Sequence, residues 1–133
     1  MESAFEMKLL QHEEYSDWDA RFNCFHDGVL ESFAVDFEWS PSVALIVFRT
    51  KDQTSPSGWS RVTLRLAGVT SLKLQEGPRS TNRVIVGGLH VLFEDGQVAV
   101  EWELDNPPAS LSELMTSECN VVADSLEWDA HHM

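Results

Sequence analysis

The chain has 133 residues, 43% of them hydrophobic, which suits one domain that buries a core without disulfides or metals. Its net charge of −13 disfavours nucleic acid and anionic lipid as partners, because both are negatively charged. No apolar run approaches the ~20 residues of a membrane span, and the N-terminus lacks the basic-then-apolar pattern of a signal peptide. We therefore expect a cytoplasmic protein.

The acidic residues gather toward the C-terminal end. Residues 1–83 contain all nine Lys and Arg with twelve acidic residues, a balance of −3, whereas residues 84–133 contain ten acidic residues and no Lys or Arg, a balance of −10. Such a field speeds the encounter with a basic protein. The plainer interpretation is that excess negative charge only keeps a small domain soluble.

The apolar residues between positions 5 and 22 follow two different spacings. Residues 5–9 alternate as in a strand, whereas Tyr15, Trp18 and Phe22 recur at helical spacing. This pattern predicts a short first strand and then a short helix that turns Trp18 and Phe22 inward.

A long alternating strand is predicted from Val29 to Trp39, ended by the Ser40-Pro41 turn. Glu31 breaks the alternation, because a period of two places it on the apolar face. A bulge between Gly28 and Phe33 would return its side chain to solvent, and the alternative is a buried functional carboxylate.

Three further segments follow. Residues 43–50 are almost continuously apolar, which is typical of a central strand covered on both faces. Residues 51–58 are rich in turn formers and predict an exposed loop. Val62, Leu64 and Leu66 then alternate with polar residues, which indicates a strand with a basic outer row, and residues 69–74 predict another short strand.

The Asp95-Gly96 dipeptide lies between alternating apolar residues and predicts a tight hairpin with a type I′ turn. A two-residue loop pairs Phe93 with Val98 on an apolar, buried face. The opposite face places His90 beside Glu101, which we interpret as a surface cross-strand pair.

Beyond the hairpin, Ser110 and Glu113 occupy the positions of a capping box, so residues 110–117 predict a short helix. Residues 119–128 predict a last strand, and the terminal residues 129–133 are expected to fray. Together the elements predict an α+β, mostly β fold over residues 1–133. We expect a single antiparallel, strongly curled sheet of about six to eight strands with short helices near the N-terminus and around 110–117.

The chemistry-bearing residues form no diagnostic motif. HExxH, GxSxG, phosphate-loop and GxGxxG patterns do not occur, so we predict no enzyme activity, no catalytic residues, no cofactor and no metal. Cys24 and Cys119 lack CxxC spacing, which predicts two free, largely buried thiols. His26, Asp27, Glu31 and His90 suit a ligand or metal chemically; the plainer interpretation of His26-Asp27-Gly28 is a turn with positive φ at Gly28.

The segment Phe25-His26-Asp27-Gly28-Val29-Leu30 resembles the strand opening F-H-D-x-x-[IVL] of small bacterial domains, over about residues 15–50. Some of those domains are immunity proteins of polymorphic toxin systems. The resemblance implies a protein that binds and blocks a cognate toxin, often a nuclease, without chemistry of its own. This chain has Gly28 where many such segments carry a small non-glycine residue.

Three hypotheses follow from these observations. The first is a non-catalytic acidic protein-binding domain with exposed contacts at Glu101, Glu103 and Asp105; its narrower form is an immunity-type inhibitor of a basic toxin. The second is a small-molecule or metal-binding β-domain that uses His26, Asp27, Glu31 and His90. The third is a self-associating structural subunit, such as a homodimer that pairs strand edges.

Overall fold

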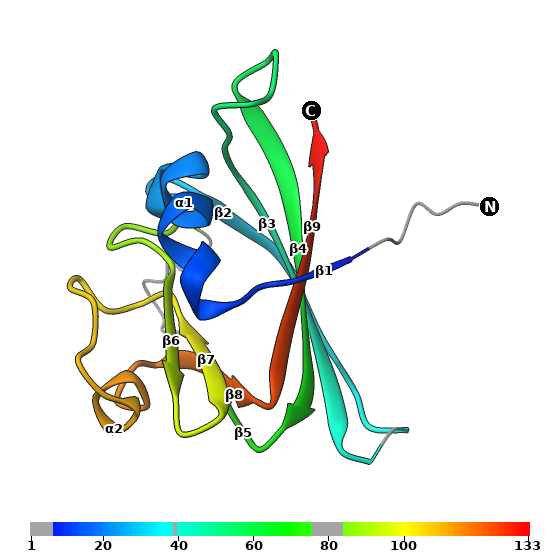
Figure 1. The fold of residues 1–133 in the computed structure, drawn as a ribbon, viewed down its shortest axis with the longest axis vertical. Coiled ribbons are helices and arrows are strands. Elements are labelled where there is room, and N and C mark those ends of the chain that lie inside the picture. The colour runs from blue at the N-terminus through cyan, green and yellow to red at the C-terminus, as the bar shows by residue number, and fades with distance from the viewer. Residues whose placement is uncertain (1–6, 39, 76–83) are drawn as a thin grey trace.

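The computed structural model describes residues 7–38, 40–75 and 84–133. Within them the strands form two antiparallel sheets (Figure 1). The first sheet has the order β1-β9-β4-β3-β2 and contains β1 (Lys8–Leu9), β2 (Val29–Asp36), β3 (Ser42–Lys51), β4 (Trp59–Val69) and β9 (Ser125–His132). The second has the order β5-β8-β7-β6 and contains β5 (Ser71–Leu74), β6 (His90–Glu94), β7 (Gln97–Glu101) and β8 (Cys119–Ala123). The mostly β prediction is confirmed, but the single curled sheet is wrong.

A bent two-stranded ribbon joins the sheets. β4 pairs with β9 in the first sheet, and their continuations β5 and β8 pair in the second. The amide of Thr70 donates to Val122 O at 2.9 Å, and that of Asp124 donates to Ala67 O at 3.0 Å, so the ribbon stays hydrogen-bonded through the bend. The single strand predicted over residues 119–128 is therefore two strands, separated at Asp124.

The main core lies between the sheets. The inner face of the first sheet contributes Ile46, Phe48 and Leu64, and the second contributes Val100 and Trp102. β3 alternates between buried and more accessible residues, and Leu45 on its outer face is 41% exposed. The prediction that residues 43–50 are covered on both faces is thus wrong, because the second sheet covers only one face.

Four short helical segments complete the described elements: η1 (His12–Glu14), α1 (Tyr15–Arg21), η2 (Asn23–Phe25) and α2 (Leu111–Leu114). α1 lies on the same side of the first sheet as the second sheet does (Figure 1). Trp18 and Phe22 are buried there, as the helical spacing predicts. Ser110 caps α2 by accepting from the Glu113 amide at 3.2 Å. No helix in the described part of the chain has the length and apolar content to cross a membrane.

The hairpin is confirmed. β6 and β7 pair Phe93 with Val98 and His90 with Glu101, and the turn between them has φ of 54° at Asp95 and 76° at Gly96. These positive angles define the mirror-image turn that the Asp-Gly sequence favours. Phe93 and Val98 face the main core, whereas the opposite face of the hairpin packs on α2.

Residues 51–58 and 129–133 both form hydrogen bonds with segments distant in sequence. Within residues 51–58, Asp52 is only 1% exposed and accepts hydrogen bonds from Arg21, Ser60 and Thr54. The C-terminal residues do not fray, because β9 pairs with β4 as far as His132. The exposed loop predicted over residues 51–58 is confirmed except at the buried Asp52 and Ser55, whereas the expected fraying of residues 129–133 is wrong.

Candidate functional site

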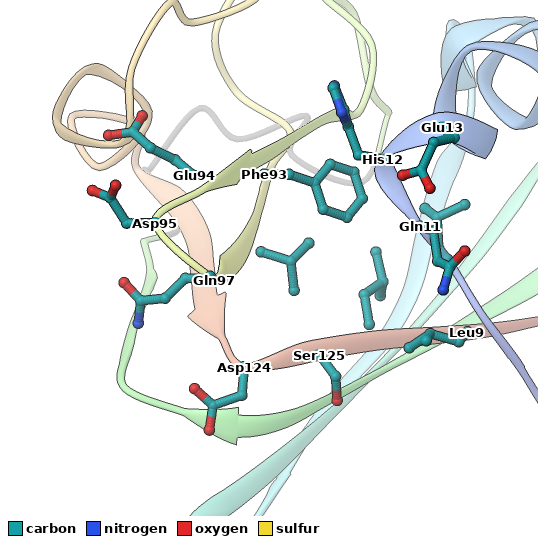
Figure 2. Close-up of a pocket in the computed structure, with 14 residues that line it drawn as sticks. Leu9, Gln11, His12, Glu13, Phe93, Glu94, Asp95, Gln97, Asp124 and Ser125 are labelled. Atoms are coloured by element: carbon teal, nitrogen blue, oxygen red, sulfur yellow. The ribbon is translucent and has the colours of Figure 1, made fainter.

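A hollow of about 480 Å³ lies where three segments meet: residues 9–13, 93–98 and 124–126 (Figure 2). The first segment joins β1 to η1, the second is the tip of the β6–β7 hairpin, and the third begins β9 at the bend between the sheets. Its volume falls within the range of small-ligand pockets in proteins. The hollow is therefore large enough to receive a side chain or a small molecule.

Hydrogen bonds between residues distant in sequence hold the walls of the hollow in place. The Leu10 amide donates to Leu126 O at 2.9 Å, which ties the first wall to β9. The Leu111 amide donates to Glu94 Oε1 at 2.9 Å, which ties the hairpin to the start of α2. The second wall ends at the tight turn formed by Asp95 and Gly96.

Apolar side chains form the base of the hollow. Leu10, Val98 and Leu126 belong to the main core, and the half-buried Phe93 ring packs against it. The His12 ring lies 5.5 Å from the Phe93 ring, centroid to centroid. Because Leu10, Val98 and Leu126 are at most 3% exposed, a ligand that enters the hollow meets mainly the Phe93 and His12 rings and the exposed Leu9 side chain.

Acidic residues from all three walls border the hollow, but Figure 2 shows the Glu94, Asp95 and Asp124 carboxylates turned outward from it. These acidic residues are Glu13 from the first wall, Glu94 and Asp95 from the hairpin, and Asp124 from the bend (Figure 2). No described Lys or Arg lines the hollow. Glu13, Asp95 and Asp124 form no ion pair with any described residue. The border of the hollow therefore carries negative charge, which suits a positively charged partner.

The residues predicted from the sequence as a ligand site lie outside the lining of the hollow, and of them His26 and His90 are both near enough to act on the Asp19 carboxylate. His26 is exposed, and its Nδ1 lies 3.1 Å from Val86 O. The Asp27 side chain is 74% exposed and lies 3.8 Å from Lys51 Nζ. The turn at this segment is confirmed, but the positive φ of 63° belongs to Asp27, not to Gly28. Gly28 is instead close to backbone, with the Phe25 carbonyl 2.9 Å from the position of an added Cβ.

Glu31 occupies the predicted bulge. The β2–β3 register shifts between Leu30 and Ser32, which turns Glu31 onto the outer face of the first sheet. Its carboxylate accepts from Arg61 Nε at 2.6 Å and pairs with Arg49 Nε at 2.9 Å. The hydrogen bond from Arg61 lowers the pKa of Glu31, since it stabilises the charged form. Glu31 therefore serves a surface ion pair rather than a buried site.

His90 and Glu101 are buried, so the predicted surface pair is wrong. Glu101 is 0% exposed and His90 is 7% exposed. Glu101 Oε2 pairs with His90 Nδ1, and Glu101 Oε1 accepts from the Glu103 and Leu104 amides at 2.8 Å each. The chain that leaves β7 curls back and supplies these amides. Glu101 is thus a structural carboxylate and is unavailable as an exposed contact.

Glu103 and Asp105 lie outside the hollow. Glu103 is half-buried, and its pKa is raised by burial and further by the neighbouring Glu118 and Glu101 carboxylates. Asp105 is exposed. Of the three predicted acidic contacts, Glu101, Glu103 and Asp105, only Asp105 is fully accessible to a partner, and Glu103 is partly so.

Cys24 does not have the properties of a nucleophile. Burial and a hydrogen bond to Asp19 raise the pKa of its thiol to about 11. A thiol in that state is protonated near neutral pH, whereas nucleophilic cysteines have lowered pKa values. Both cysteines are free, and Cys119 is buried.

The acids around the hollow escaped prediction as a site. The sequence pattern predicts Asp95 only as a turn residue and gives Glu13 no role. The excess of acidic residues over residues 84–133 indicates an acidic surface that includes Glu94, Asp95 and Asp124. Nothing local in the sequence places residues 9–13 beside the hairpin tip.

The described residues contain no group of three or more His, Cys, Asp or Glu arranged to hold a metal ion. Comparisons of the chain with protein-family models, with curated proteins and with solved structures find no match.

Proposed function

We propose that this protein is a non-catalytic acidic domain that binds a basic protein. The observation that carries the proposal is the acidic border of the hollow, to which three separate segments contribute Glu13, Glu94, Asp95 and Asp124, while no described Lys or Arg lines it. Interfaces combine an apolar centre with a polar rim, and complementary charge selects the partner.

The wider charge distribution supports the same proposal. Residues 84–133 carry ten acids without Lys or Arg, and they supply two walls of the hollow. A negative field over one part of a surface raises the association rate of a positive partner and repels nucleic acid. The cationic side chains of the first sheet instead include Arg49, Arg61 and Arg65, which pair with acids on the same face.

An immunity-type inhibitor of a basic toxin, such as a nuclease, is the narrower form of the proposal. It draws on the resemblance of residues 15–50 to small bacterial domains, and it is compatible with a domain that acts by binding alone. The hollow also has the volume of a small-molecule site, so a cationic metabolite is the second candidate. A thermal-unfolding midpoint that rises on adding cationic metabolites would favour that candidate.

The test is capture of partners from a lysate of the host by the tagged protein, at low and at high salt, with mass spectrometry of what is retained. The proposal predicts a basic protein that is retained at low salt and released at high salt, because salt screens exposed charges. Retention of acidic proteins only, or of a set unaffected by salt, contradicts it.

A further inference from the structure

We propose that two copies of this chain associate through the outer face of the first sheet, the face that is turned away from the second sheet. In the described part of the chain, the second sheet and α1 lie on the opposite face (Figure 1). The contact is between sheet faces, not between the strand edges of a homodimer that extends the sheet. The inference goes beyond the proposed function and does not rest on it.

One strand of this face is apolar on its outward side. Val43, Leu45 and Val47 point outward from β3; Leu45 is 41% exposed, and the two valines are half-buried. A sheet face in contact with water alternates outward polar residues with inward apolar ones, whereas a strand covered on both faces is continuously apolar. β3 has the second pattern, yet the described part of its own chain covers only the inner face. A second copy supplies the missing cover.

The two strands next to β3 across the sheet carry opposite charges on the same face. β4 contributes Arg61 and Arg65, and β9 contributes Glu127 and Asp129. Arg65 Nη1 lies 2.9 Å from Glu127 Oε1, and their side chains are 40% and 34% exposed, so each can also meet a charge from outside. At the sheet edge, β1 pairs Leu9, which is 50% exposed, with Glu127.

One row of residues across this face is therefore complementary to itself. From β3 to β1, the register places Leu45, Arg65, Glu127 and Leu9 side by side. A two-fold axis that runs along the strands, between β4 and β9, sets Arg65 of each copy opposite Glu127 of the other and Leu45 opposite Leu9. Facing sheets lie about 10 Å apart, a gap that such long side chains fill. Each Arg65 then lies between two carboxylates, one from each copy.

The charge of this face opposes self-association little, although the net charge of the chain is −13. The charged residues that point outward from its paired strands balance, with four positive and four negative side chains. Two copies of an acidic protein repel each other least through a neutral face. The eight residues are Glu31, Asp36, Arg49, Lys51, Arg61, Arg65, Glu127 and Asp129.

The test is sedimentation equilibrium of the full chain over a range of protein concentrations. The wild type should show a reversible monomer–dimer equilibrium with a Kd below about 100 µM. Leu45→Thr keeps a residue that suits a strand but removes aliphatic surface, so it should weaken the dimer about threefold or more.

Two charge reversals test the predicted pairing. Arg65→Glu sets two carboxylates opposite each other in the homodimer, and Glu127→Arg sets two arginines opposite each other. Each variant alone should weaken self-association about tenfold or more. An equimolar mixture of the two variants should form a heterodimer, because every carboxylate of one chain then meets an arginine of the other. Circular dichroism of each variant confirms that it is folded before mixing.

The matched controls are Lys73→Glu and Glu118→Arg. Both positions are exposed and lie in or beside the second sheet, and the substitutions change the net charge by the same amounts. Each control should leave the Kd of the dimer within about twofold of the wild-type value.

Three outcomes overturn the inference: no wild-type dimer at about 100 µM, a dimer that both charge reversals leave intact, or a mixture of the two variants that stays monomeric while the wild type dimerises. A heterodimer formed only by the mixture supports it. Capture of a basic partner is decided separately, since a monomeric protein that retains such a partner keeps the proposed function and removes only the dimer.

Discussion

Arg21 and Asp52 form a two-pronged ion pair between α1 and the loop after β3. Arg21 Nε donates to Asp52 Oδ1 at 3.0 Å, and Arg21 Nη2 donates to Oδ2 at 3.1 Å. The Ser60 hydroxyl adds a bond of 2.5 Å to Oδ2, and the Thr54 amide donates to Oδ1 at 2.9 Å. One buried carboxylate therefore connects a helix, a loop and β4.

Replacement of Asp52 by asparagine should destabilise the fold by about 2 to 4 kcal/mol, because it leaves Arg21 without its charged partner and alters a buried network. Urea unfolding followed by Trp fluorescence measures the change. Asp27→Asn is the matched control, since Asp27 is exposed and its pair with Lys51 is long, and it should change stability by less than about 0.5 kcal/mol. Equal effects of the two variants would show that the Asp52 network contributes little.

Asp52 should also make stability depend on pH. Burial raises the pKa of Asp52, but hydrogen bonds from Arg21, Ser60 and Thr54 outweigh it and hold the pKa well below its ordinary value of 3.8. A group with a depressed folded-state pKa stabilises the protein above its unfolded pKa. This contribution should fade as the pH falls below about 4. Urea midpoints measured from pH 7 down to pH 2 should fall more steeply for the wild type than for Asp52→Asn, and parallel curves would contradict this assignment.

Glu101→Gln should destabilise the protein by about 2 to 4 kcal/mol, although Glu101 was expected at the surface. The amide cannot accept at every position where the carboxylate now meets His90 and the Glu103 and Leu104 amides. The exposed Asp105→Asn is the control and should leave the unfolding midpoint unchanged. A Glu101→Gln midpoint that matches this control would mean that the buried pair is dispensable.

Gly68→Ala should cost more stability than Gly58→Ala. Both glycines have positive φ, 74° and 84°, so alanine strains the backbone by about 1 kcal/mol at either position. At Gly68 an added Cβ also meets the Asp124 side chain, including Cβ at 2.9 Å, whereas nothing lies within 4 Å at Gly58. We expect an additional loss of about 1 to 3 kcal/mol at Gly68, measured by chemical unfolding. Similar losses at both positions would show that the contact at the bend is relieved by movement of Asp124.

The sequence predicts best where neighbours in the chain decide the structure. The Asp95-Gly96 turn sets the register of its hairpin because a two-residue loop and a period of two leave one solution. Glu31 on an apolar face likewise indicates a bulge, because a charge there must reach solvent or a partner.

Prediction from the sequence fails where a residue is buried by segments that are distant in the chain. Glu101 has the pattern of a surface residue, and only the return of residues 103–104 buries it. Residues 119–128 show no local break, yet the ribbon bends at Asp124 because a second sheet must close over the first. The hollow depends on the approach of residues 9–13 to the hairpin tip, which no periodicity encodes.

The most direct test of the central claim is the association rate of the protein with its captured basic partner across a range of salt concentrations. Wild type should associate fast at low salt and slow steeply as salt increases. The variant with Glu13→Gln, Asp95→Asn and Asp124→Asn should associate more slowly, with a flatter dependence on salt. Identical rates and salt dependence for the two proteins would contradict the claim that the acidic hollow meets the partner.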